Sequence, residues 1–200
     1  MAIGKYCSSV FPSMNARLVS MKTATLGGTV SLLALLVHYL AQDSELFSST
    51  ESFLCLWGIV LMITFSGLAG FLYQESQRIR QPVLSVLVRR MFYGLFPAFL
   101  VGFVFTILLW SDPFKETIFW LIFYGLGLLS TQQTAPRSLM VLGWAFTFIG
   151  VDLTTYLSIM QLPDPGDLAA SMTMALTFGL FHLLYAGYLF VFRPKSGSAR

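Results

Sequence analysis

Charged side chains are scarce in this sequence. Lysine and arginine number 12, and aspartate and glutamate number 9, so charged residues make up 10% of the 200 residues. Soluble domains usually contain about 25% charged residues, whereas this chain is 56% apolar with a mean hydropathy of +0.75. So few charges cannot cover a water-soluble globule, and so apolar a chain lacks the composition of disordered segments. The composition therefore indicates a membrane protein.

Cysteine and histidine are equally scarce, with two of each. Cys7 and Cys55 are predicted on opposite sides of the membrane and have no C-x-x-C partner, so no disulfide or cysteine metal site is expected. The two histidines lack an H-E-x-x-H motif, and their different depths argue against shared haem ligation. We expect no cofactor and no metal. We also expect no nucleic-acid partner, because the net charge of +3 comes from bases beside the membrane.

Six long stretches between charged residues define the predicted fold. Five of them contain 20 to 25 residues without Asp, Glu, Lys or Arg, and the sixth, 138–163, is interrupted only by Asp152. A transmembrane helix needs about 20 mainly apolar residues, and none of the stretches shows the alternation of a membrane β-barrel strand. The sequence predicts an all-α, polytopic membrane helical bundle. Its six transmembrane helices are expected at 23–41, 53–73, 91–110, 117–133, 138–160 and 169–192.

The basic residues predict the orientation of the bundle. Eleven of the 12 lie in the termini, in the second loop or at the start of the fifth helix, whereas seven of the nine acidic residues lie in or beside the other loops. The positive-inside rule then places both termini in the cytoplasm. Apolar residues recur at helical spacing within residues 1–22, so this part is predicted to be a cytoplasmic amphipathic, interfacial segment. The six-helix transmembrane domain would occupy 23–192 and a cytoplasmic tail 193–200.

Three ionisable side chains, His38, Asp152 and His182, fall inside the predicted helices. Such groups are costly in a bilayer and are the first candidates for a functional site. Each histidine lies on a stripe of small residues, which is typical of a protein-facing helix surface. One interpretation is a polar ladder that relays protons or lines a small pocket, and the other is that each group is satisfied separately. The candidate polar core is His38, Asp152, Thr155, Tyr156, His182 and Tyr185, with no catalytic residue assigned.

Pro97 lies within the third predicted helix. Proline lacks the backbone N–H that would bond to the carbonyl of Tyr93, so a helix kink is predicted at this position. The freed carbonyl is a ligand or gating element in one interpretation. In the other interpretation the kink is purely structural.

Two stretches in the second half of the chain are distinctive. One begins Ala135-Pro136-Arg137-Ser138 and continues to Leu142-Gly143-Trp144-Ala145-Phe146, and the other is Thr177 to Ala186, which contains His182 and Tyr185. These stretches resemble a set of small, uncharacterised bacterial six-span membrane proteins, mainly over spans four to six. The resemblance implies the six-span topology and a multi-pass protein of the bacterial inner membrane. It supplies no reaction and no catalytic residue.

Three classes of function stay open at this point. A small transport, sensing or partner-binding bundle, whose polar core handles protons or a small solute, is favoured because few polar groups converge for catalysis. The second class is a membrane-embedded enzyme that acts on a lipid or quinone-like substrate, with His182 as acid and base. The third is a scaffold subunit of a membrane complex. The expected partners are the lipid bilayer and either another membrane protein or further copies of the chain.

Overall fold

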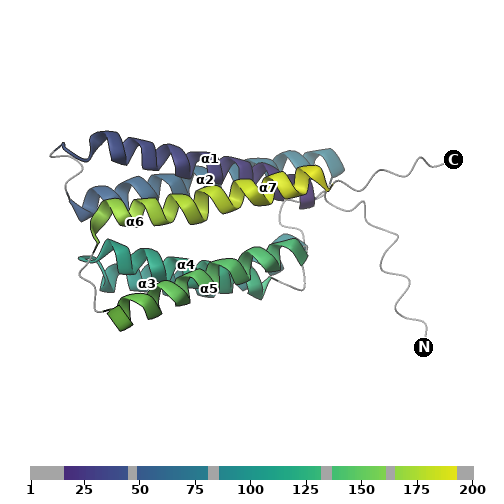
Figure 1. Cartoon of the computed structure of the whole chain (residues 1–200). Helices are drawn as coiled ribbons and strands as arrows, with labels where there is room; N and C mark the ends of the chain where they lie inside the picture. Colours follow the sequence, from purple (N-terminus) through teal and green to yellow (C-terminus); the bar gives the residue numbers. More distant parts are fainter. Residues whose placement is uncertain (1–15, 45–48, 81–85, 132–136, 161–164, 193–200) are drawn as a thin grey trace, which may run out of the picture.

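The structure, a computed structural model, is all-α, as predicted (Figure 1). It describes residues 16–44, 49–80, 86–131, 137–160 and 165–192. The last three helical segments follow one another without a break, so these residues form six helical rods. The elements are α1 (Ala16–Ala41), α2 (Thr50–Ile79), α3 (Val86–Leu108), α4 (Pro113–Ser130), α5 (Arg137–Met160), α6 (Gly166–Met174), the π-helix η2 (Ala175–Phe181) and α7 (His182–Val191).

Four of the rods are long and apolar enough to cross a membrane, namely Arg17–Ala41, Thr50–Ile79, Ser138–Met160 and Gly166–Val191. The chain is therefore an integral, multi-pass membrane protein. The remaining rods, α3 and α4, correspond to the third and fourth predicted spans, and their crossing of the membrane stays a prediction.

The predicted helix boundaries hold to within five residues except at the start of α1 and the end of α2. α1 begins at Ala16 rather than at residue 23, because no proline or glycine interrupts the chain between them. α2 continues to Ile79 rather than to residue 73. Residues 16–22 of the predicted interfacial segment are thus the first turns of the first long helix. Residues 1–15 and the predicted tail at 193–200 lie outside the described residues.

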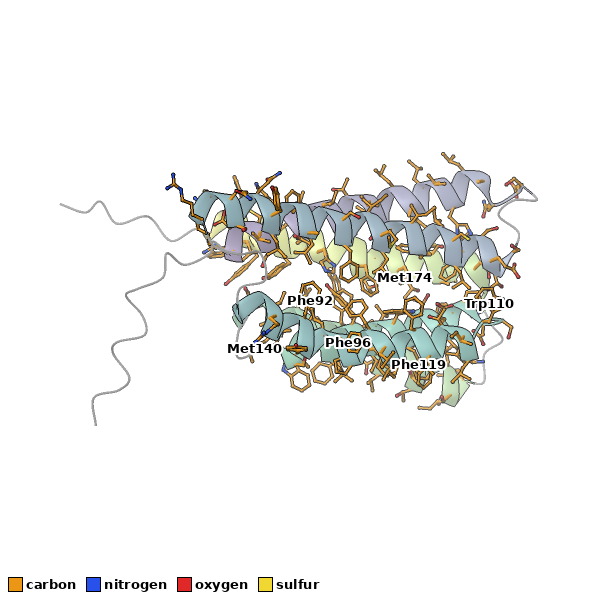
Figure 2. The ribbon with its side chains drawn as sticks, turned by 180° about the vertical axis from the view of Figure 1, so that it is seen from behind. Phe92, Phe96, Trp110, Phe119, Met140 and Met174 are labelled. Atoms are coloured by element: carbon orange, nitrogen blue, oxygen red, sulfur yellow. The ribbon has the colours of Figure 1, made fainter. Side chains whose placement is uncertain are left out.

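The six rods form two three-helix layers, which are visible from both sides of the molecule (Figures 1 and 2). In one layer α1 packs against α2 and against the rod α6–η2–α7, and in the other layer α4 packs against α3 and α5. The layers meet where α4 packs against α6, whereas α2 and α3 have little contact with each other. The side chains of Phe92 and Met174 lie between the layers (Figure 2).

The two ends of the bundle carry opposite charge. The acidic end, as we name it, bears Asp43, Glu51, Asp112 and Asp167, and the basic end bears Arg17, Lys22, Arg78 and Arg89. Glu75 lies at the basic end, where it is buried and pairs with Arg78 at 2.6 Å. This separation follows the pattern seen in the sequence. The side of the membrane that each end faces stays a prediction.

Glycines bring the helices of each layer into backbone contact. A Cβ atom added to Gly28 of α1 would lie 2.8 Å from the carbonyl oxygen of Gly179 in η2. In the other layer, a Cβ atom on Gly125 of α4 would lie 2.7 Å from the carbonyl oxygen of Gly143 in α5. The small-residue stripes predicted on the first and last spans therefore do face protein. Their buried members include Ser31, Ala34, His38, Ala175 and Ala186.

Candidate functional site

The structure does not bring the predicted polar core together. Asp152, Thr155 and Tyr156 are exposed on the outward surface of α5. The buried face of that helix runs through Phe146 and Gly150, and at helical spacing it continues toward Leu153 rather than Asp152. No ladder from His38 through Asp152 to His182 is formed among the described residues, because helical periodicity turns Asp152 away from both histidines.

His38 is buried and takes part in a separate hydrogen-bond chain. Its Nδ1 lies 2.7 Å from the hydroxyl of Ser171 in α6. The indole Nε1 of Trp57 in α2 donates to the same hydroxyl at 3.1 Å. The chain links α1, α2 and α6 within one layer, which is the separately satisfied arrangement considered from the sequence.

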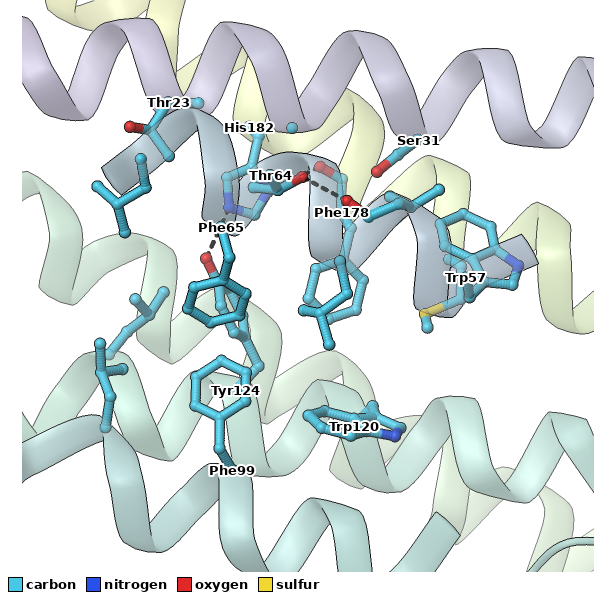
Figure 3. Close-up of a pocket in the computed structure, with 18 of the residues that line it drawn as sticks. Thr23, Ser31, Trp57, Thr64, Phe65, Phe99, Trp120, Tyr124, Phe178 and His182 are labelled. Atoms are coloured by element: carbon cyan, nitrogen blue, oxygen red, sulfur yellow. Dashed lines mark hydrogen bonds between the residues drawn. The ribbon is translucent and has the colours of Figure 1, made fainter. Parts of the chain in front are cut away.

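His182 is paired with Tyr124 of α4, in the opposite layer (Figure 3). Its Nε2 lies 2.8 Å from the Tyr124 hydroxyl, and its Nδ1 lies 2.7 Å from the carbonyl oxygen of Phe178. Since a carbonyl only accepts, Nδ1 must carry the proton, and Nε2 accepts from the tyrosine hydroxyl. No pattern in the sequence marks Tyr124, which is one tyrosine in an apolar helix.

The π-helix directly before His182 helps to set its position. η2 contains seven residues, from Ala175 to Phe181. Bonds from residue i to i+5 widen the turn and move the following side chains around the helix axis, and such segments occur frequently at functional sites. His182 is thus directed toward the space between the layers, where it meets Tyr124.

That space is an elongated cleft of about 420 Å³ with a mainly apolar lining. All six rods contribute to its walls, including α2 from Phe53 to Leu72 and α3 from Phe92 to Thr106, and Trp110 in the turn after α3 also lines it. Nineteen residue steps along α2, from Phe53 to Leu72, at about 1.5 Å each, give the cleft a length of about 28 Å. The cleft therefore extends along nearly the full thickness of a bilayer's hydrocarbon core, which is about 30 Å.

One side of the cleft is closed by aromatic side chains. Phe146 of α5 is 0% exposed, and its ring centroid lies 5.0 Å from that of Tyr124, 4.9 Å from that of Phe178 and 5.9 Å from that of Phe181. These four rings join α4, α5 and the last rod. We call this the closed side.

The opposite side, between α2 and α3, is open. Among the described residues, the single pair of aromatic rings that joins these helices is Phe65 and Phe99, whose centroids lie 5.4 Å apart (Figure 3). Phe92 and Phe103 line the cleft and yet are 45% and 60% exposed. The cleft therefore opens sideways, between helices of a membrane protein. We call this the open side.

Few polar groups line the cleft, and several lack a partner among the described residues. Glu116 of α4 is 4% exposed. Its Oε1 accepts a hydrogen bond from the Thr106 hydroxyl at 3.0 Å, and Trp120 Nε1 donates to that hydroxyl at 2.9 Å. Oε2 of Glu116 and the hydroxyls of Thr23 and Thr117 have no partner there. Leaving such a group unsatisfied costs about 1–3 kcal/mol, so the cleft offers hydrogen-bonding groups to an occupant.

The remaining predicted residues divide between the cleft and the rest of the molecule. Tyr185 is 7% exposed and lines the cleft, as His182 does. Pro97 lies within the continuous helix α3, is exposed and does not line the cleft, so the predicted kink and gating role stay predictions. Within the described ranges, no three His, Cys, Asp or Glu side chains come together as a metal site would require.

Comparison of the chain with protein-family models, curated proteins and solved structures finds no match. The resemblance to small bacterial six-span proteins therefore stays a prediction.

Proposed function

We propose that this protein binds a lipid-like molecule in the cleft between its two three-helix layers. The observation that carries the proposal is the sideways opening of a long apolar cleft between α2 and α3. A molecule dissolved in the bilayer reaches such an opening by lateral diffusion, without passing through water. In this proposal all six rods cross the membrane, both termini face the cytoplasm, and the membrane is the bacterial inner membrane.

The composition of the cleft wall supports an apolar ligand. Three of the four tryptophans line it, Trp57, Trp110 and Trp120, together with several phenylalanines. Ligand sites usually measure about 300–1,000 Å³ and combine an apolar lining with a few placed polar groups. This lining favours a chain-like apolar molecule over the protons or small polar solute expected from the sequence.

A second candidate function is an enzyme that acts on the bound lipid or quinone-like molecule. The hydrogen bond between Tyr124 and His182 favours it, because the pair lines the cleft and connects a hydroxyl donor to an imidazole acceptor. Such a pair is able to exchange a proton with the polar part of a bound molecule. Both candidate functions require that the molecule binds in the cleft, so binding is the property to test.

The test uses two glycines of α2 that differ in position but tolerate the same change. A Cβ atom on Gly58 or on Gly70 would meet no atom within 4 Å, and only Gly58 lines the cleft. Gly58→Phe should fill part of the cleft without displacing a helix. Gly70→Phe adds the same ring to the outer surface of the same helix and is the matched control.

The protein is placed in vesicles that contain a phospholipid with a photoactivatable diazirine in its acyl chain, and the labelled residues are mapped after illumination. We expect label on cleft residues such as Thr64 and Trp120, as well as on outward residues such as Met62. Gly58→Phe should lower cleft labelling severalfold, and Gly70→Phe should leave it unchanged. Labelling restricted to outward residues in the unaltered protein would refute the proposal.

A further inference from the structure

We propose that the acidic end of the cleft is a subsite for a protonated amine on the bound amphiphile, with Glu116 accepting its hydrogen bond. This inference rests on the proposed function, because the apolar tail attached to the amine would occupy the cleft. The ligand class is then a single-chain or lipid-like amine.

One carboxylate oxygen of Glu116 accepts a hydrogen bond, and the other has no hydrogen-bond partner among the described residues. Glu116 lies in the first turn of α4, lines the cleft and is 4% exposed. The Thr106 hydroxyl of α3 fixes Oε1 at 3.0 Å, while Oε2 has no hydrogen-bond partner among the described residues. A buried carboxylate is stable only when it is paired or hydrogen-bonded. An N–H donor in the cleft would satisfy Oε2.

Aromatic rings surround the same end of the cleft. Trp57 belongs to α2, Trp110 to the turn after α3 and Trp120 to α4, and all three line the cleft. Trp120 lies one helical turn from Glu116, and its indole N–H is already used by Thr106, so its ring face remains for an occupant. Aromatic faces attract cations, most strongly when water is excluded. Carboxylate and indole together match an ammonium group better than a hydroxyl or a phosphate.

The charges around this end favour the same ligand. Asp43, Glu51, Asp112 and Asp167 lie at the acidic end, and the nearby base Lys115 forms an ion pair with Asp112 at 2.5 Å. A surface with one predominant sign of charge raises the local concentration of opposite charge. Cations are therefore drawn to this end and anions are repelled. An acidic residue in the first turn of a helix also stabilises that helix, but this role alone predicts no preference among ligands.

The experiment is a competition against the photoactivatable phospholipid in zwitterionic vesicles, with unlabelled dodecylamine, dodecanol or dodecanoate as competitor. These probes share a twelve-carbon chain and differ in their polar end. The readout is the membrane concentration of each competitor that halves cleft labelling. Labelling of outward residues corrects for partitioning into the bilayer. The variants are Glu116→Gln, which keeps size and a hydrogen-bonding oxygen, and Asp152→Asn, which removes an exposed acid that does not line the cleft.

We expect dodecylamine to halve the labelling of the unaltered protein at about a tenfold lower concentration than dodecanol, with dodecanoate weakest. Glu116→Gln should remove the preference for the amine and leave the value for dodecanol unchanged, and Asp152→Asn should keep the preference. The unaltered protein alone tests the subsite, so a variant that fails to fold does not block the result. Equal displacement by amine and alcohol would overturn the subsite and leave lipid binding intact, whereas absence of cleft labelling would overturn both.

Discussion

Aromatic residues lie on both the open and the closed side of the cleft, but they pack around a buried ring only on the closed side. On the closed side Phe146 is surrounded by Tyr124, Phe178 and Phe181 and is 0% exposed. On the open side the ring pair of Phe65 and Phe99, the single such pair among the residues that the structure describes, spans the distance between α2 and α3. In a bilayer, lipid chains are as apolar as the side chains, so helices are held by close packing rather than by hydrophobicity. The closed side has such packing and the open side lacks it, which leaves room for a lipid-like ligand.

The largest effect is expected from removing the central ring of the closed side. Phe146→Ala should lower the free energy of unfolding by about 3 kcal/mol, because it leaves a cavity where four rings meet. Phe96→Ala in α3, at a position 64% exposed, should cost less than about 0.5 kcal/mol. Thermal unfolding of both variants in the same detergent measures the difference. Equal costs would mean that the closed side does not hold the layers together.

A smaller effect is expected from the polar contact on the closed side. Tyr124→Phe keeps the ring and removes the hydroxyl that donates to His182, so Nε2 is left without that donor. We expect a loss of about 1–2 kcal/mol in unfolding free energy. Tyr156→Phe, at an exposed position on α5, is the control and should have no effect. A neutral Tyr124→Phe would show that the hydrogen bond does not contribute to stability.

A still smaller change in stability is expected on the open side. Phe65→Ala breaks the ring pair with Phe99, which is worth about 0.5–1.5 kcal/mol. The same change widens the opening between α2 and α3, so photolabelling of Thr64 and Trp120 by the acyl-chain probe should increase. Both measurements are made on the same preparation. Decreased labelling in Phe65→Ala would contradict the position that we assign to the opening.

The smallest effect is expected for Asp152, which the sequence places in the polar core and the structure places outside the cleft. Asp152→Asn should leave cleft labelling and its competition by dodecylamine unchanged, since the side chain faces away from the cleft. A clear loss of labelling in this variant would show that Asp152 belongs to the site after all. Glu116→Gln provides the comparison, because its carboxylate does line the cleft.

The sequence predicts the helices well and the site only in part. Runs without charge define the six rods, because a charge inside a bilayer is costly, and small-residue stripes identify the faces where α1 and η2 meet. The interior position of His182 follows from such a stripe. The pairing of His182 with Tyr124 could not be predicted, because Tyr124 belongs to the other layer and no local sequence pattern shows which distant helices pack together. The outward position of Asp152 was predictable, because Asp152 does not fall on the helical repeat that contains Phe146 and Gly150, which are buried residues of α5.

The central claim is that bilayer lipid enters the cleft, and fluorescence of Trp120 tests it most directly. Trp57, Trp110 and Trp144 are replaced by Phe, and the protein is placed in vesicles of a phospholipid with or without bromine on its acyl chains, since bromine quenches indole only in near contact. We expect strong quenching of Trp120, its reduction by Gly58→Phe and no reduction by Gly70→Phe. Trp120 fluorescence that is the same in brominated and unbrominated vesicles would contradict the account.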